Sequence, residues 1–539
     1  MPEPKIAGWS RKGRVLAGLA LALLPFCGPH AQGQPARAAA AVHPNIILIV
    51  ADDLGYGDLG PYGQHRIMTP TIDRMAASGT MFTNFYAGSP ACAPSRCTLL
   101  TGKNGGSCPI RTNFHATLPG DEVTLGERMQ AAGYTTAIFG KWGQGNANTP
   151  RDSLHQGFAY SFGYQDQLSA HLSYPGFLWA SGGQAFTGSI PRSGAPLRRI
   201  DVNGAYAPDL IHDQAMAFIN NAPAEPFFLY YATTIPHANN EEEGDGILES
   251  PDLGPYADRD WTLPNRTYAA LITRLDDHIR EIWEAAQTDT IRPTVIIVTA
   301  DNGPHGIAGV DIGFFDSTGG LRGSKYSLHE GGIRVPLIVW SNAPNVPVPA
   351  AKVDDRPTYF PDLTATTLAL AGVAIPAELS GIDILATDRT DDPERPLYWE
   401  FHAKAHGGWA VRTGPWKTVS SEMSDGWERL LSRILRLDLV GRGTPAEPQL
   451  YNLATDPGET VDLAGEHPEI VARHLAIARE QHVSPRVADA LDMFRRREGI
   501  NKYHLMRFGA AVAALVVLLA FVPIRRRIPR HKKKSLAKD

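Results

Sequence analysis

The sequence is poor in cysteine, and none of its histidines and cysteines has a spacing that resembles a zinc site. Only 4 cysteines occur in 539 residues, and the formal net charge of -5 gives no general case for a nucleic-acid partner. Internal repeats and sustained low-complexity tracts are also absent. With 43% hydrophobic and 20% charged residues, the composition is that of an ordinary globular protein. The length alone allows about three or four domains.

The N-terminus has the layout of a secretory signal peptide. Several basic residues precede the apolar run Val15–Leu24, and the alanine-rich stretch Ala31–Ala41 offers competing cleavage sites. We therefore predict that residues 1–42 are a signal peptide. A retained N-terminal membrane anchor is the alternative.

The C-terminus repeats this layout in reverse. Residues 508–524 carry no charge, and as a helix they would measure about 26 Å, at the short end of the range that spans a membrane. Basic residues crowd the tail at 525–539, and such clusters stay on the cytoplasmic side. These features predict an exported, single-pass protein of the cell membrane. Its main body would lie on the periplasmic or extracellular side, beyond a polar stalk at 479–507. The alternative is a buried hydrophobic helix with a basic tail.

The middle of the chain alternates apolar strands with amphipathic helices. Asn45–Val50 and Thr294–Thr299 are continuous runs of mostly β-branched and leucine residues, which are typical of strands buried on both faces. In Tyr268–Ala286 the apolar residues recur on one helical face. The alternation predicts an α/β fold over residues 43–375, with a large, mostly parallel sheet sandwiched by helices. Short strands and turns rich in glycine, proline and aspartate predict a smaller C-terminal α+β domain at 376–478.

Two of these strands end directly in acidic and amide side chains. Asp52 and Asp53 follow the first strand, and Asp301 and Asn302 follow the other. Ligands of such folds bind beyond the carboxyl ends of the strands, and these oxygen ligands suit Ca2+ or Mg2+ better than zinc. Adjacent acids at a strand end are often only a turn or a helix cap. The repeated arrangement nevertheless favours a site for one divalent cation, with Ca2+ preferred to Mg2+.

The segment from Cys92 to Lys103 carries the most specific signal. It reads Cys-Ala-Pro-Ser-Arg-Cys-Thr-Leu-Leu-Thr-Gly-Lys and resembles the signature of the type I sulfatases, in the alkaline-phosphatase superfamily. The family's pattern is Cys-x-Pro-Ser-Arg-x-x-Leu-x-Thr-Gly-Arg, and only the final arginine is replaced, by Lys103. The resemblance extends from Pro44 to Ala478, and over this range the chain is similar to bacterial arylsulfatase A-like enzymes.

The resemblance implies an alkaline-phosphatase-like fold and an activity. In this family a separate maturation enzyme converts the motif cysteine to formylglycine. The chain would then hydrolyse sulfate monoesters, of a sulfated carbohydrate or an aryl alcohol, to alcohol and inorganic sulfate. A metal-bound hydroxyl of the hydrated aldehyde at position 92 would attack sulfur.

The resemblance also implies roles for individual residues. Arg96 would hold the aldehyde hydrate, and Lys141 and Lys325 would bind sulfate oxygens. His237 would contact the bridging ester oxygen and, with Lys325, protonate the departing alcohol. The implied metal ligands are Asp52, Asp53, Cys92 after its conversion, Asp301 and Asn302.

One position departs from the family's pattern. Many members read Gly-Lys-Trp-His, and that histidine contacts the formylglycine and assists sulfate release. This chain has Gly143 there, as in a bacterial subset. We predict that His171 binds at the substrate site and substitutes as the base. An ordinary core histidine is the alternative.

Two other functions share part of the pattern. A phosphatase or phosphodiesterase of the same superfamily would share the fold and the metal loops, but such members usually carry serine or threonine as nucleophile, or two metals. A catalytically inactive binding module would tolerate the loss of ligands or lysines, and none is missing here. If a signal peptide removes Cys27 and Cys92 is converted, Cys97 and Cys108 remain as a candidate disulfide pair.

Overall fold

The computed structural model describes ten stretches of the chain: 43–113, 117–181, 196–221, 224–241, 247–288, 292–346, 348–387, 392–402, 407–421 and 447–483. The predicted signal peptide, the predicted transmembrane segment and the basic tail lie outside these stretches. So does most of the predicted stalk.

The described stretches correct the prediction of a membrane-spanning protein. None of their helices is long and apolar enough to cross a membrane. The helix α5, Leu263–Ala286, has the length, but Arg274, Asp277 and Arg280 make its outer face polar. The prediction of a single-pass membrane protein is therefore wrong on this finding, and the segment 508–524 on which it depended lies outside the described residues.

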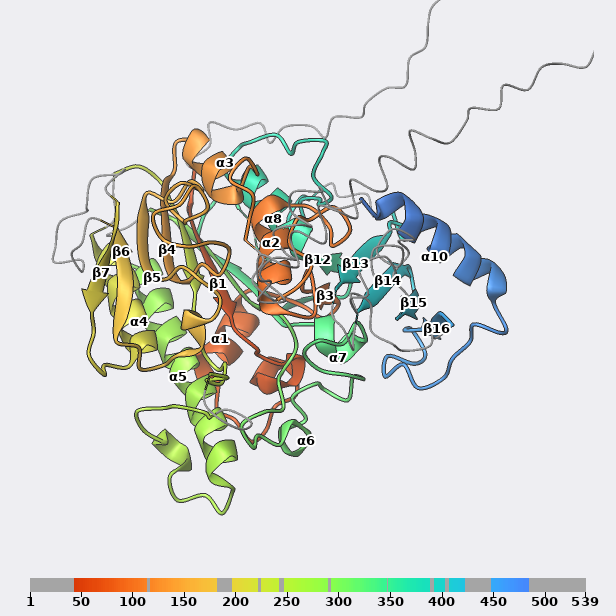
Figure 1. Cartoon of the computed structure of the whole chain (residues 1–539), viewed down its shortest axis with the longest axis horizontal. Coiled ribbons are helices and arrows are strands. Elements are labelled where there is room, and N and C mark those ends of the chain that lie inside the picture. Colours follow the sequence, from red (N-terminus) through yellow and green to blue (C-terminus); the bar gives the residue numbers. More distant parts are fainter. Residues whose placement is uncertain are drawn as a thin grey trace, which may run out of the picture. The chain divides into compact units, whose positions relative to one another are not determined.

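A ten-stranded sheet carries the acidic clusters (Figure 1), and its strands follow the order β11-β2-β10-β9-β1-β8-β4-β5-β6-β7. The five strands from β9 to β5 in this order are parallel, and antiparallel pairs join β10, β6 and β7 to them. All residues of β1 and β9 are buried, as their continuous apolar runs predict. The strands of this sheet are β1 (Asn45–Ala51), β2 (Thr80–Phe82), β4 (Thr135–Lys141), β5 (Tyr160–Tyr164), β6 (Phe177–Ser181), β7 (Leu197–Asp201), β8 (Phe227–Ala232), β9 (Thr294–Ala300), β10 (Leu337–Ser341) and β11 (Lys352–Asp354).

Two groups of helices pack against this sheet (Figure 1). In the first group α5 contacts α1 and α4, and these two contact β10 and β4. In the second group α2, α3 and α8 contact one another, and α3 also contacts β4. The structure thus confirms a mostly parallel sheet between helices. The bounds are α1 (Pro70–Ser78), α2 (Cys92–Thr101), α3 (Leu125–Ala131), α4 (Ala207–Asn220), α6 (Ile312–Phe315), α7 (Glu330–Ile333) and α8 (Phe360–Leu370).

A separate antiparallel sheet, β13-β14-β15-β16, forms the C-terminal part, and α10 (Pro468–Gln481) packs on β14 and β15. Trp399 of β13 shares a hydrophobic cluster with Tyr86 and Ala91, and its Nε1 donates to the carbonyl of Ala87 at 2.8 Å. The small sheet therefore supports the segment that leads into α2. The strands are β13 (Leu397–Phe401), β14 (Gly408–Thr413), β15 (Trp416–Ser420) and β16 (Gln449–Asn452), and a two-stranded pair joins β3 (Phe85–Tyr86) to β12 (Thr358–Tyr359).

Most expected elements are present, with shifted ends. The long helix starts at Leu263 rather than at Tyr268, because Thr262 caps it and Pro264 occupies its first turn. The domain boundaries at 375 and 478 stay predictions.

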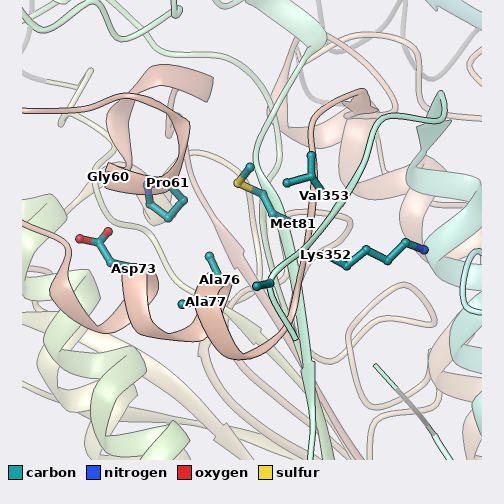
Figure 2. Close-up of a pocket in the computed structure, with 9 residues that line it drawn as sticks. Gly60, Pro61, Asp73, Ala76, Ala77, Met81, Lys352 and Val353 are labelled. Atoms are coloured by element: carbon teal, nitrogen blue, oxygen red, sulfur yellow. The ribbon is translucent and has the colours of Figure 1, made fainter. Parts of the chain in front are cut away.

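A surface pocket of about 360 Å³ opens beside α1, β2 and β11 (Figure 2). Pro61, Asp73, Met81 and Lys352 are among its lining residues, and none of the residues predicted for chemistry lines it. It lies at the β11 edge of the sheet, whereas the acidic clusters follow central strands. The pocket is therefore not the candidate active site.

Candidate active site

Two neighbouring parallel strands deliver the acidic side chains to one point. Ala51 at the end of β1 lies opposite Ala300 at the end of β9, so the residues that follow emerge at the same edge of the sheet. The backbone N–H of Asp301 donates to the carbonyl of Ala51 at 3.0 Å, and that of Asp53 donates to Asp301 Oδ1 at 3.2 Å. The structure thus brings together both predicted metal loops.

Cys92 faces this acidic cluster from the first residue of α2. Its Sγ lies 3.3 Å from Asp52 Oδ1 and 3.9 Å from Asp53 Oδ1. Among the described cysteines Cys92 is the free one, and a disulfide joins the candidate pair Cys97 and Cys108. Position 92 is therefore at a buried helix N-terminus, and its neighbours are carboxylates.

Three buried cations balance the three carboxylates. Arg96, one turn into α2, donates through Nε to Asp301 Oδ2 at 2.9 Å. Lys141, the last residue of β4, donates to Asp52 Oδ2 at 2.7 Å, and Lys325 donates to Asp53 Oδ2 at 2.7 Å. Buried lysines are rare unless they are paired, so this arrangement marks a functional site more strongly than lysines at the surface would.

His237 lies beyond the end of β8, after the cis peptide bond between Ile235 and Pro236. Its Nδ1 lies 2.6 Å from the carbonyl of Ala238, which can only accept, so Nδ1 carries the proton. Its Nε2 then accepts from Lys325 Nζ at 3.0 Å. Burial, together with the Lys325 ammonium, lowers the pKa of His237 to about 4. At neutral pH the ring is therefore uncharged.

The charges of the site respond differently to burial. Burial by itself would raise the pKa of Asp52, but the Lys141 ammonium, with Arg96 and Lys325, outweighs it and holds this pKa well below its usual range. Burial and the Asp52 carboxylate raise the pKa of Asp301 to about 7. The same two causes raise the pKa of the Cys92 thiol far above its usual value, so an unmodified thiol here would be a poor nucleophile.

The cluster fits a divalent cation. Ligand atoms of Asp52, Asp53, Cys92 and His237 lie within 4.8 Å of one another. The buried Oδ1 of Asn302 has no hydrogen-bond partner among the described residues, although its Nδ2 donates to Asp53 Oδ1 at 2.7 Å. A cation would give this oxygen a partner and offset the repulsion between the carboxylates. His237, expected only at the ester oxygen, lies within the same group.

His171 also reaches the site, at the end of a short 3-10 helix, Ser169–His171. Its ring stacks on that of His237, with centroids 4.5 Å apart. Gly143, at the position where many family members have a histidine, has a φ of 66°, and a Cβ added there would lie 3.0 Å from Gln167 Oε1. Gln167 thus occupies part of the space beside Gly143.

Sequence reasoning missed several neighbours of these residues. Tyr230 accepts from Arg96 NH1 at 3.2 Å, but within an apolar strand it carries no distinguishing signal. His305 lies 3.7 Å from Asp53 Oδ2, and its place directly after the second metal loop would have identified it. Glu241, which bonds His171, comes from a distant loop.

Comparison with known proteins identifies relatives along most of the chain. A family model described as Sulfatase matches residues 44–373. Arylsulfatase A of Homo sapiens is 31% identical over 471 residues, which cover 80% of this chain and 86% of that protein. The N-acetylgalactosamine-6-O-sulfatase of Bacteroides thetaiotaomicron is 28% identical over 537 residues, which cover 84% and 95%. The solved structure of Ps i-CgsB in complex with k-i-k-neocarrahexaose has a TM-score of 0.63 at 23% identity, over 86% of this chain and 99% of that one, and shares the fold.

A buried cysteine lies beside carboxylates that fit a divalent cation, and two lysines donate to these carboxylates. This arrangement is typical of a metal-dependent ester hydrolase. The matching family model spans more than half of the chain, and the chain belongs to the sulfatase family. It is a sulfuric ester hydrolase, which splits sulfate monoesters into alcohol and inorganic sulfate. The resemblance of the segment from Cys92 to Lys103 to type I sulfatases is confirmed, and the family uses a divalent metal and formylglycine.

Proposed function

We propose that the nucleophile is formylglycine made from Cys92 by a maturation enzyme that reads the motif around it. The observation that carries the proposal is the placement of Cys92, buried at the start of α2 with its Sγ 3.3 Å from Asp52 Oδ1. Lys141 donates to the other oxygen of the same carboxylate. The hydrated aldehyde supplies a hydroxyl as nucleophile at a point where a cation site and a lysine meet.

The cation is proposed to be Ca2+, held by Asp52, Asp53, Asp301, Asn302 and residue 92. Bound there, such an ion would supply Lewis-acid chemistry, which polarises a sulfate oxygen and makes a nearby hydroxyl more acidic. The ligand oxygens come from fully buried side chains that face one another directly. Mg2+ usually keeps several waters, whereas Ca2+ accepts such a protein cage, so this crowding favours Ca2+.

The remaining residues act on the sulfate group and on protons. Arg96, whose guanidinium donates to Asp301, holds the hydrated aldehyde at position 92. Lys141 and Lys325 bind sulfate oxygens and stabilise the charge that grows in the transition state. His237 and Lys325, 3.0 Å apart, together supply the proton that the departing alcohol needs. His171, whose ring stacks on that of His237, serves as the base that takes the proton whose loss lets residue 92 release sulfate.

The substrate is proposed to be a sulfated carbohydrate or an aryl sulfate. The names of two relatives, an arylsulfatase and an N-acetylgalactosamine-6-O-sulfatase, support these two classes. Residues 1–42 are proposed as a signal peptide, with a catalytic domain at 43–375 and a C-terminal domain at 376–478.

The test combines mass spectrometry with turnover. We expect a formylglycine mass in the peptide that contains residue 92, and hydrolysis of 4-nitrophenyl sulfate faster than of 4-nitrophenyl phosphate. The variant Cys92→Ala should be inactive and keep its melting temperature. An unmodified thiol in every active molecule would contradict the nucleophile. Faster turnover of the phosphate ester would favour the phosphatase alternative.

A further inference from the structure

The imidazole ring of His171 lies against the ring of His237, and the carboxylate of Glu241 contacts His171. The rings of His171 and His237 are stacked, with centroids 4.5 Å apart and planes that differ by 9°. His171 Nδ1 lies 2.8 Å from Glu241 Oε1. Because an ionised carboxylate can only accept, Nδ1 carries the proton of His171, and Nε2 faces the carboxamide nitrogen of Gln167 at 3.5 Å.

The hydrogen bonds of His237 leave one degree of freedom open. Its contacts to the carbonyl of Ala238 and to Lys325 both act in the plane of the ring, at Nδ1 and Nε2. They restrain the ring's position but only weakly its tilt about the line that joins these two contacts. The face of His171 lies against the ring and restrains that tilt. The orientation of His237 therefore depends on the orientation of His171.

We propose that Glu241 is a positioning residue for the leaving-group step, which holds His237 in line with the departing oxygen through the stacked ring of His171. The inference rests on the proposed function, because it requires His237 and the Lys325 ammonium together to deliver the proton that the departing alcohol needs. Glu241 suits this role because its own backbone N–H donates to Asn239 Oδ1 at 3.1 Å, which restrains the backbone from which its side chain extends. Of the two His171 ring contacts, that to Glu241 is the shorter by 0.7 Å (3.5 against 2.8 Å).

The variant Glu241→Gln keeps the size of the side chain and removes its charge. Loss of a partner that orients a metal-ligating histidine typically costs 10- to 100-fold, and for the indirect contact here we expect the low end, about a tenfold loss, because the stacking itself persists. The loss should depend on the leaving group. Phenyl sulfate, whose alcohol needs a proton as it departs, should lose about tenfold in kcat, and 4-nitrophenyl sulfate, whose anion departs unaided, less than about twofold. KM should change little for both.

The chain offers a matched control in a second stacked pair of histidines. His212 and His278 stack with centroids 4.1 Å apart, and Glu281 lies 3.1 Å from His212 Nε2. These residues belong to α4 and α5, and in the described part of the chain His278 contacts Asp209 and Tyr231, which are not among the site residues. Glu281→Gln should therefore leave both substrates within about twofold of the wild type. Glu241→Asp, which retains the charge, should recover part of the loss on phenyl sulfate.

Each outcome decides a separate point. Equal losses on both esters would assign Glu241 to the sulfate-release step, in which His171 is the proposed base, and would overturn its role in the leaving-group step. A changed KM alone, or unchanged turnover of phenyl sulfate, would overturn that role as well. If Glu241→Gln lowers the melting temperature, the two esters are compared in Glu241→Asp instead, provided that this variant keeps the wild-type melting temperature. Failure of the proposed function is seen in the unsubstituted enzyme, as an absent formylglycine mass or absent sulfate release. An active wild type without the selective loss rejects only the inference about Glu241.

Discussion

Lys417 of β15 forms ion pairs with two buried carboxylates, Glu330 of α7 and Glu459. Its Nζ lies 2.8 Å from Glu330 Oε1 and 3.0 Å from Glu459 Oε1, and all three side chains are fully buried. The substitution Lys417→Met keeps the length of the side chain but leaves both carboxylates without their shared cation. Breaking a buried ion pair from one side costs about 3–5 kcal/mol. We expect the low end, about 3 kcal/mol, because Arg334 remains 3.6 Å from Glu330.

The free energy of unfolding is the quantity to measure, by denaturant titration followed through tryptophan fluorescence. As a control, Lys352→Met removes an exposed lysine 3.2 Å from Asp354, which keeps its ion pair with Arg356, and should cost no more than about 1 kcal/mol. Adding Glu330→Gln to Lys417→Met should recover part of the lost stability, since one uncompensated charge is removed. A single variant within about 1 kcal/mol of the wild type, or a double variant no more stable than the single one, would refute this reasoning.

The same cluster predicts a dependence of stability on pH. Burial by itself would raise the pKa of Glu330, but Lys417 and Arg334 outweigh it and lower this pKa to about 2. A pKa below the value of about 4.3 in the unfolded chain gives stability that is fully present above that pH and lost as the pH falls toward 2. Unfolding titrations at several acidic pH values should show this loss in the wild type and a shallower one in Lys417→Met. Equal slopes would contradict the assignment.

Three further outcomes are expected. Gly143→Ala should cost about 1–2 kcal/mol in stability and lower turnover, because the φ of Gly143 is 66° and the added Cβ would lie 3.0 Å from Gln167 Oε1. Denaturant titration and steady-state kinetics measure the two effects, and wild-type values in both would contradict the steric argument. Chelation of divalent cations should stop turnover and lower the melting temperature, and Ca2+ should restore both; full activity after complete removal of the metal would rule out a catalytic cation. Lys141→Met should reduce kcat/KM by about 100-fold or more, while Lys352→Met stays near the wild type; similar kinetics for the two variants would remove Lys141 from the sulfate site.

The order of elements and the main site could be predicted because their signals are local. The apolar runs that begin at Asn45 and Thr294 each form a buried strand, and the residues directly after a strand lie at its carboxyl end. The motif that begins at Cys92 identified the family from a dozen adjacent residues. Element ends were less certain, as the earlier start of α5 shows, because a cap such as Thr262 competes with the hydrophobic pattern. The membrane prediction is contradicted, since no helix in the described residues is long and apolar enough to cross a membrane, and the terminal segment on which it depended lies outside those residues.

By itself the sequence determined the alternation of strands and helices, the two acidic loops and the cysteine between them. These features depend on neighbours along the chain, so their spacing could be read directly. Three contacts become visible in the folded chain alone. Glu241 contacts His171, 70 residues away in the sequence, Arg96 donates to Tyr230, and Lys417 donates to Glu330. Such contacts between distant segments carry no local pattern, because any polar side chain at a loop or a strand face looks alike until the chain folds and burial makes its partner necessary.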